Sequence, residues 1–246
     1  MALRAVTNAS LPDKVFAQLA GEIVSGRYRP GTTLPSERTL SSVFTVNRHV
    51  VREALGRLEQ LGLVRVVQGG GTTVLDYRLT AGLDLLAVLA EHADAGEGML
   101  APLGAALEMR AGIGIDVARL CARRATPEVR DALGATAERL AAVATGRELL
   151  AIDRLFWQQM VDGAANFAYQ LAFNSLMRGV QAAPELSVSW LEHELAASDY
   201  RRPIAAAIAA GDPPAAGEAT RAALEPAVAA MDALRPRIDA ASAGPT

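Results

Sequence analysis

The sequence predicts a mainly α-helical protein with two domains, and two observations lead to this fold class. Residues 34–74 hold two helical patterns joined by a three-residue turn, followed by two short β patterns joined by glycines. From Ala81 onward the helical pattern continues almost without interruption and contains no strand pattern. The first region therefore has the element order of a winged helix-turn-helix with a small β-hairpin wing. The second predicts an all-α bundle of six or seven helices.

The second helix of the first region begins near Asn47 and carries an apolar stripe at helical spacing. The stripe consists of Val51, Ala54, Leu55, Leu58 and Leu61. Gly62 follows the last apolar position, where a left-handed C-terminal cap is expected. The hairpin is then expected to use Leu63 to Val67 as one strand, Gln68 to Gly71 as its tip, and Thr72 to Leu75 as the return strand.

Polar and basic side chains lie on the other faces of this helix. Asn47, Arg48 and Arg52 have the donors needed in a DNA major groove, where Arg binds guanine and Asn binds adenine. Arg38, one turn into the preceding helix, can reach a phosphate or a base edge beside them. Taken alone, such a cluster is more often a solvated helical face. The neighbouring hairpin and the turn formed by Leu34 to Arg38 favour a DNA interface instead.

This region resembles the DNA-binding domain of the GntR superfamily of bacterial transcription regulators. The resemblance rests on Pro30-Gly31, Leu34 to Arg38, Leu40, Val46 to Arg48, Val51 to Leu55, Leu58, Gly62-Leu63 and Gly69 to Thr72. In that family the arginines matching Arg38, Arg48 and Arg52 touch DNA, and the wing tip follows the minor groove. The expected DNA-binding residues are Arg38, Asn47, Arg48, His49, Arg52, Gln68, Gly69 and Gly70. Thr45 stands where the family usually has Gly, and we expect the turn to tolerate it.

Length, composition and charge agree with two domains. The chain has 246 residues, of which 51% are hydrophobic, and a net charge of −3. Met1 to Arg78 carries ten Lys or Arg against six Asp or Glu, a balance of +4, which leaves −7 for the rest. The basic region is therefore the one with the DNA-binding pattern. The single cysteine, Cys121, is expected in the core. The lack of a long apolar segment predicts a cytoplasmic protein without a membrane partner. A DNA-binding protein of this kind is expected at the nucleoid.

Composition also suggests the domain boundaries. Residues 1–75 are expected to form the DNA-binding domain, the short polar segment 76–80 a linker, and residues 81–240 the helical domain. A first helix is expected from Leu11 to Ser25, capped by Asn8 or Ser10. The resemblance to the GntR superfamily implies that this helix packs under the second helix of the DNA-binding pattern as a scaffold. Breaks between the later helices are expected near residues 96–98, 126–127, 146, 163–166, 184 and 211–214.

The helical domain is similar to the ligand-binding FCD bundle of the FadR subgroup. The similarity rests on Leu107 to Arg110, Arg123 to Thr126, Asp153 to Phe156, Asn166 and Ile208 to Asp212. Many FCD domains bind a divalent metal through one Asp and three His. Asp153 matches the Asp, but Trp157, Arg201 and Ala223 stand at the positions expected to carry His. One carboxylate without imidazoles is a weak ligand set, so no bound metal is expected.

The same resemblance suggests an effector. The pattern, including Thr80 to Leu86, is closest to the fatty-acid regulator of the subgroup, which also lacks the metal set and senses long-chain acyl-coenzyme A. An acyl-CoA or fatty acid is one expected effector, whereas the FCD group as a whole favours small organic acids. The candidate ligand-binding residues are Arg110, Asp153, Trp157, Asn166 and Arg201. Arg110 lies on an apolar stripe and needs an anion, which either Asp153 or the ligand provides, and Trp157 either lines a ligand cavity or fills the core.

Together these expectations describe a regulator of transcription. A homodimer would bind a palindromic operator in double-stranded DNA, and a small effector in the helical domain would change the operator affinity. A ligand-free dimerisation bundle is the alternative. An enzyme is not expected, because the sequence shows no nucleophile with an adjacent His, no phosphate-binding loop and no metal-ligand quartet. No cofactor other than the effector is expected.

Overall fold

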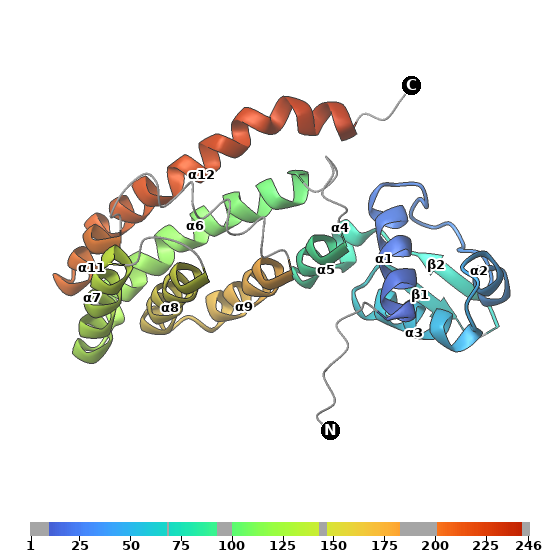
Figure 1. Ribbon diagram of the computed structural model, residues 1–246, viewed down its shortest axis with the longest axis horizontal. Helices are drawn as coiled ribbons and strands as arrows, with labels where there is room; N and C mark the ends of the chain where they lie inside the picture. Colours follow the sequence, from blue (N-terminus) through green and yellow to red (C-terminus); the bar gives the residue numbers. More distant parts are fainter. Residues whose placement is uncertain (1–9, 68, 93–99, 143–146, 183–200, 243–246) are drawn as a thin grey trace. The chain divides into compact units, whose positions relative to one another are not determined.

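The computed structural model describes residues 10–67, 69–92, 100–142, 147–182 and 201–242 (Figure 1). Contacts divide the chain into two compact units, Met1–His92 and Ala93–Thr246. The regular structure of the described residues is helical apart from one two-stranded sheet in the first unit. The mainly α fold class is therefore confirmed.

The first unit has the element order of a winged helix-turn-helix. Its elements are α1 (Leu11–Val24), α2 (Glu37–Val43), α3 (Arg48–Gln60), β1 (Val64–Val67), β2 (Gly71–Val74), α4 (Tyr77–Thr80) and α5 (Asp84–His92). The two strands pair antiparallel, and Val64 lies opposite Val74. Both strands lie within one residue of their expected positions. The predicted wing is thus present after α3.

The first helix is the expected scaffold. Ser10 is the N-cap of α1 and forms a capping box with Asp13, whereas Asn8 lies outside the described residues. Hydrogen bonds from Ser10, together with the nearby guanidinium of Arg57, lower the pKa of Asp13 to about 2. The buried residues of α1 are Val15, Phe16, Leu19, Ala20 and Ile23.

The buried face of α3 holds the first unit together. Val51, Ala54 and Leu58 are 0% exposed. They share one apolar cluster with Phe16 and Leu19 of α1. Removing a side chain such as Val or Leu from water contributes about 1.5–3 kcal/mol, so the stripe fixes the rotation of α3 about its own axis. The opposite face of α3 must then point to solvent.

A glycine ends α3, as predicted. Leu61, expected on the stripe, is the C-cap residue and is only half-buried. Gly62 follows with a φ of 72°, the left-handed conformation that glycine adopts without a steric penalty. The N–H of Gly62 donates to the Glu59 carbonyl at 2.9 Å, and the N–H of Leu63 donates to the Leu58 carbonyl at 2.9 Å. These two bonds form a Schellman motif, which turns the chain into β1.

The first unit continues beyond the wing. The Thr80 hydroxyl donates to the Gly62 carbonyl at 2.6 Å, and a Cβ at Gly62 would collide with the Thr80 carbonyl oxygen. Leu85 of α5 is buried in the same cluster as α1 and α3. Contacts therefore divide the chain after His92 rather than at the expected linker 76–80. The segment is polar and was therefore expected to be a linker, but it forms the short helix α4, which contacts the first unit through Thr80 and Gly62.

The second unit is helical throughout its described residues. Its helices are α6 (Leu100–Arg124), α7 (Pro127–Ala142), α8 (Arg147–Ala164), α9 (Phe167–Ala182), α11 (Arg201–Ala209) and α12 (Pro213–Ser242). The long helices α6 and α12 lie side by side (Figure 1). The expected breaks near residues 126–127, 163–166 and 211–214 fall between helices. Those near residues 96–98, 146 and 184 lie outside the described residues.

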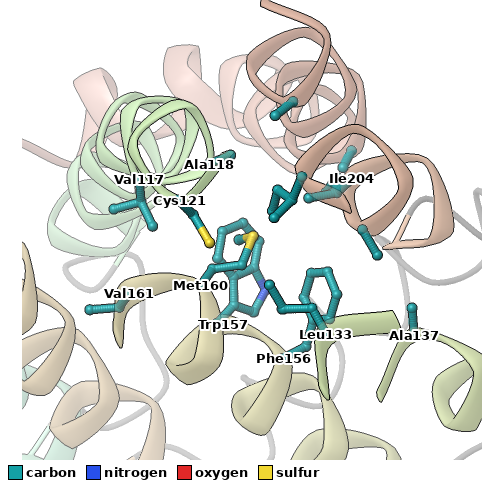
Figure 2. Close-up of a cluster of buried hydrophobic side chains, with 14 of the residues drawn as sticks. Val117, Ala118, Cys121, Leu133, Ala137, Phe156, Trp157, Met160, Val161 and Ile204 are labelled. Atoms are coloured by element: carbon teal, nitrogen blue, oxygen red, sulfur yellow. The ribbon is translucent and has the colours of Figure 1, made fainter. Parts of the chain in front are cut away.

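Small residues let the helices of the second unit approach closely. Cys121 of α6 is 0% exposed, and a Cβ at Gly163 of α8 would come within 2.6 Å of its sulfur. Figure 2 shows Cys121 beside Met160 and Trp157 of α8. Burial raises the pKa of the Cys121 thiol to about 12, so the thiolate does not form at neutral pH. Cys121 is the core residue that the sequence predicted.

One ion pair is buried in the second unit. Arg201, the first residue of α11, donates from Nε to Oδ1 of Asp153 on α8 at 2.7 Å, and its Nη2 binds the same oxygen. The side chains of Arg201 and Asp153 are 3% and 12% exposed. A charge in such a place is tolerated only because its partner is present. The pair therefore fixes the start of α11 against α8.

We expect Thr45→Gly to stabilise the protein. Thr45, in the turn between α2 and α3, has a φ of 55°, a left-handed conformation that disfavours a β-branched side chain. The substitution should raise the free energy of unfolding by about 0.5–1 kcal/mol, measured by urea denaturation. Gly26→Ala is the matched control because it makes the reverse change at a left-handed position, with a φ of 80°, where an added Cβ meets no atom within 4 Å, and it should destabilise. A loss of stability in Thr45→Gly would contradict this account of the turn.

We expect Arg201→Met to destabilise the second unit severely. The change leaves the Asp153 carboxylate buried without its cation, which costs about 3–5 kcal/mol of unfolding free energy. Replacing both residues, Asp153→Leu with Arg201→Met, should recover most of that loss. The adjacent Arg202 forms an exposed pair with Glu138, so Arg202→Met should cost less than about 1 kcal/mol. Equal effects of the two Met variants on urea denaturation would refute the structural role of the buried pair.

Candidate nucleic-acid interface and effector site

The exposed face of α3 carries basic side chains. Arg48, His49 and Arg52 are all exposed, on the side of the helix opposite to the buried Val51 and Leu55. Residues four apart lie one above the other on a helix, so the two arginines form one ridge. The packing of the apolar stripe therefore presents this ridge to solvent, as the sequence predicts.

The preceding helix adds a further cation and an anion. Arg38 of α2 is exposed, as expected for a DNA contact. Beside it, Glu37 accepts a hydrogen bond from Nε of Arg52, with 2.8 Å between Nε and Oε2. Glu37 was not among the expected DNA-binding residues, because its partner is fifteen residues away and no local pattern links them. Helices α2 and α3 thus meet at one charged contact on the candidate interface.

Asn47 has a structural task in addition to its expected contact with DNA. It is the N-cap of α3, and its side-chain oxygen accepts from the Val50 N–H at 3.0 Å. The cap satisfies one of the N–H groups that a helix start leaves open. A carboxamide that caps a helix is held in one orientation and still carries two N–H donors. The role of Asn47 in DNA binding stays a prediction.

The wing adds exposed backbone and side chains. Gly69 and Gly70 at its tip are exposed, and Gln68 lies outside the described residues. Gly69 has a φ of 77°, which a tight hairpin turn requires and which glycine adopts readily. Arg65 on β1 is also exposed, opposite Thr73. Arg65 was not among the expected DNA-binding residues, although a basic residue within an otherwise apolar strand was a signal for it.

In the second unit the candidate ligand residues form two contacts. Asp153 and Arg201 make the buried ion pair described above. Arg110 is half-buried on α6, and its guanidinium carbon lies 5.4 Å from the centre of the Trp157 ring, a cation–π contact. The expectation that Asp153 could be the partner of Arg110 is corrected, because the carboxylate binds Arg201. The reason is tertiary, since α11 brings Arg201 to Asp153 across forty-eight residues.

Trp157 belongs to the core and has an unusual polar atom. The side chain is 6% exposed and lies within the cluster shown in Figure 2. Its Nε1 is buried without a hydrogen-bond partner among the described residues. A buried indole N–H normally donates to an acceptor, and leaving it unpaired costs about 1–3 kcal/mol. Trp157 therefore fills the core, and its role in ligand binding stays a prediction.

Asn166 is placed differently. It precedes α9, and its side-chain oxygen accepts from the N–H of Ala168 at 3.0 Å and of Tyr169 at 3.4 Å. These bonds cap the start of α9. The described contacts do not join Asn166 to the other candidate ligand residues, so its role in ligand binding stays a prediction.

The residues at the family's metal positions do not fit a divalent cation. Asp153 is paired with a guanidinium, and Trp157 and Ala223 lie in the apolar cluster. A divalent transition metal needs several imidazole, thiolate or carboxylate ligands around one point. Within the part of the chain that the structure describes, no group of three or more His, Cys, Asp or Glu side chains is placed to hold one.

Comparison with known proteins matches each unit to a family. Residues 11–74 match the bacterial regulatory proteins of the gntR family, and residues 105–226 match the FCD domain. The HTH-type transcriptional regulator Mce2R of Mycobacterium tuberculosis is 39% identical over 233 residues, which cover 92% of this chain and 93% of that protein. A fatty acid metabolism regulator protein from Enterobacter sp. is 34% identical over 90 residues, 37% of this chain and 36% of its own length.

A solved structure agrees on the fold. The structure of Lar, which controls the expression of the Listeria monocytogenes agr system, has a TM-score of 0.50 and 17% identity, and the match covers 93% of this chain and 100% of that chain. At this identity the likeness shows the fold alone. The family models and the relative similar over its whole length establish more than the fold. The chain belongs to the GntR family: it is a DNA-binding transcription regulator, not an enzyme, and joins a winged helix to an FCD effector-binding domain as in the FadR subgroup.

Proposed function

We propose that this regulator reads a palindromic operator as a homodimer, through the exposed face of α3. The observation that carries the proposal is the ridge of Arg48 and Arg52, exposed opposite the fully buried Val51, Ala54 and Leu58. An α-helix fits the major groove, where arginine forms paired hydrogen bonds to guanine. Arg38, His49 and Asn47 flank this ridge, and the wing tip at Gln68 to Gly70 follows the adjacent minor groove.

A twofold dimer would place two such helices one DNA turn apart, so that the operator repeats the symmetry of the protein. Contacts to phosphates release counterions, and the operator affinity should fall steeply with salt. The regulator would act in the cytoplasm, at the nucleoid. No helix among the described residues has the length and apolar character that crossing a membrane requires.

The operator affinity would be controlled by an acidic effector bound near Arg110 and Trp157. Two observations support this part of the proposal. The Trp157 N–H is a buried donor with no acceptor among the described residues, and the Arg110 cation lies over the same ring. A carboxylate or thioester carbonyl supplies the acceptor that the indole lacks. A ligand that binds two conformations of the FCD domain unequally would shift the equilibrium between them.

Two chemical classes fit this description. One is a long-chain acyl-CoA or fatty acid, and the other is a small organic acid. The relative named for fatty acid metabolism matches over only 37% of this chain, which gives the first class limited support. Asp153 and Arg201, in this view, act through the packing of α11 on α8, and Asn166 through the start of α9. A bundle that binds no ligand and only dimerises is the remaining alternative.

We expect Arg48→Ala and Arg52→Ala each to weaken operator binding by about 1–3 kcal/mol, or about 5- to 150-fold. The reason is the loss of a base contact in the major groove. Fluorescence anisotropy would be measured on a duplex that the wild-type protein selects from a random-sequence library. Arg221→Ala is the control, since Arg221 is exposed on α12 and the change in net charge is the same. Wild-type affinity in both α3 variants would defeat the assignment of this face.

We expect an acidic effector to raise the melting temperature and Trp157→Phe to reduce that rise. Native mass spectrometry of the purified protein should first show any retained ligand. Oleoyl-CoA, oleate and citrate then serve as probes, because a molecule bound only by the folded state stabilises it according to its concentration over Kd. Phe keeps an aromatic ring but lacks the indole N–H, so Kd should rise about 10-fold for the loss of one hydrogen bond.

Phe173→Leu is a control for the effector experiment, since Phe173 is a buried aromatic residue on α9. It should reduce the stability of the free protein while leaving the Kd of the effector unchanged. An apo protein by mass spectrometry, with no melting shift from any probe or from a wider panel of organic acids, would support the ligand-free bundle instead.

A further inference from the structure

We propose that Glu37 is a positioning residue that orients Arg52 for base recognition and selects against non-operator DNA. The inference rests on the proposed role of α3 in operator binding. Glu37 begins α2, Arg52 lies in the second turn of α3, and 2.8 Å separates Oε2 of Glu37 from Nε of Arg52. The contact joins the two helices of the helix-turn-helix on the face that carries Arg38 and Arg48.

The geometry of the contact leaves the reading edge of Arg52 accessible. A guanidinium carries five N–H donors, and a guanine base requires two of them side by side. The carboxylate takes the donor on Nε, so Nη1 and Nη2 remain as the pair at the far end of the group. The side chain of Arg52 is 66% exposed, which leaves room for a base to approach that end.

Stability does not account for this ion pair. The two side chains are 66% and 34% exposed, and exposed pairs of this kind contribute little to folding. Holding an exposed arginine in one rotamer instead reduces the ordering cost when DNA binds. The pair therefore contributes mainly in the complex with DNA, where the orientation of Arg52 matters.

The charge of Glu37 has a second consequence. A carboxylate on a DNA-facing surface repels the phosphates of every duplex, whatever its sequence. Only a DNA site with a base that hydrogen-bonds to the oriented Arg52 compensates for this repulsion. Glu37 should thus lower the affinity for arbitrary DNA and raise the affinity for the operator, which are opposite effects that a purely structural role would not produce.

The test is a double-mutant cycle in the full-length protein, comprising the wild type, Glu37→Ala, Arg52→Ala and the double variant. The probes are the duplex selected by the wild-type protein and a scrambled duplex of the same composition. Glu37→Ala should weaken binding to the selected duplex about 3- to 10-fold, the scale of ordering one long side chain. It should tighten binding to the scrambled duplex, and the melting temperature should change by less than about 3 °C.

Two further variants separate orientation from charge. Glu37→Gln keeps an acceptor for Nε but removes the charge, so it should retain more operator affinity than Glu37→Ala while tightening binding to the scrambled duplex equally. Glu53 is an exposed carboxylate on α3 outside the Glu37–Arg52 pair. Glu53→Ala should tighten binding to both duplexes, because it changes charge alone.

In the cycle, Glu37→Ala should weaken binding to the selected duplex in the wild-type background but not in the Arg52→Ala background. The positioning role is overturned if that loss persists in the Arg52→Ala background, or if Glu37→Ala tightens binding to both duplexes alike. If Arg52→Ala leaves operator affinity unchanged while Arg48→Ala weakens it, the inference fails and the proposed role of α3 stands. Unchanged affinity in both variants defeats the proposed role of α3 and the inference together. If Arg52→Ala weakens operator binding but Glu37→Ala does not, the inference about Glu37 is wrong and the proposed role of α3 stands.

Discussion

The packing of α3 on α1 is the constraint on which the DNA-binding unit depends. Val51, Ala54 and Leu58 are fully buried against the side chains of α1, and this contact sets which face of α3 is free. The rotation of the helix cannot change without exposing apolar surface, at about 25 cal/mol for each Å². The exposed arginines are therefore held in place by residues that never meet DNA. The core of the first unit thus decides which side chains of α3 are exposed.

The ends of α3 are fixed by local hydrogen bonds that also serve the interface. Asn47 caps the start of the helix, in whose first turn Arg48 lies. Gly62 ends the helix in a Schellman motif and directs the chain into the wing. Thr45 is less well adapted, because its backbone takes a left-handed conformation that a β-branched residue disfavours. The turn is tolerated because the helices on both sides are packed.

The interior of the FCD unit contains polar groups of two kinds, those that have a partner and one that lacks an acceptor among the described residues. Arg201 and Asp153 satisfy each other, so this pair behaves as a structural tie between α8 and α11. The Trp157 N–H is buried without an acceptor among the described residues, although Arg110 lies over its ring. Native proteins rarely leave such a donor unpaired, because the cost approaches that of a lost hydrogen bond. The Asp153–Arg201 pair is thus satisfied within the protein, whereas the Trp157 donor is not satisfied by any described residue.

The sequence by itself determined the elements and the faces they bury, because helical periodicity, N-cap residues and helix-ending glycines are local signals. It placed α1, α3 and the wing, and it put Arg48 and Arg52 on the exposed side of α3. Tertiary structure decided which charged groups meet. The pairs Arg201 with Asp153 and Arg52 with Glu37 join residues forty-eight and fifteen positions apart. Helix α4, expected as a linker, and α5, expected in the helical domain, both belong to the first unit. Contacts of this kind depend on how separate helices approach one another in space, and a local sequence pattern does not encode that approach.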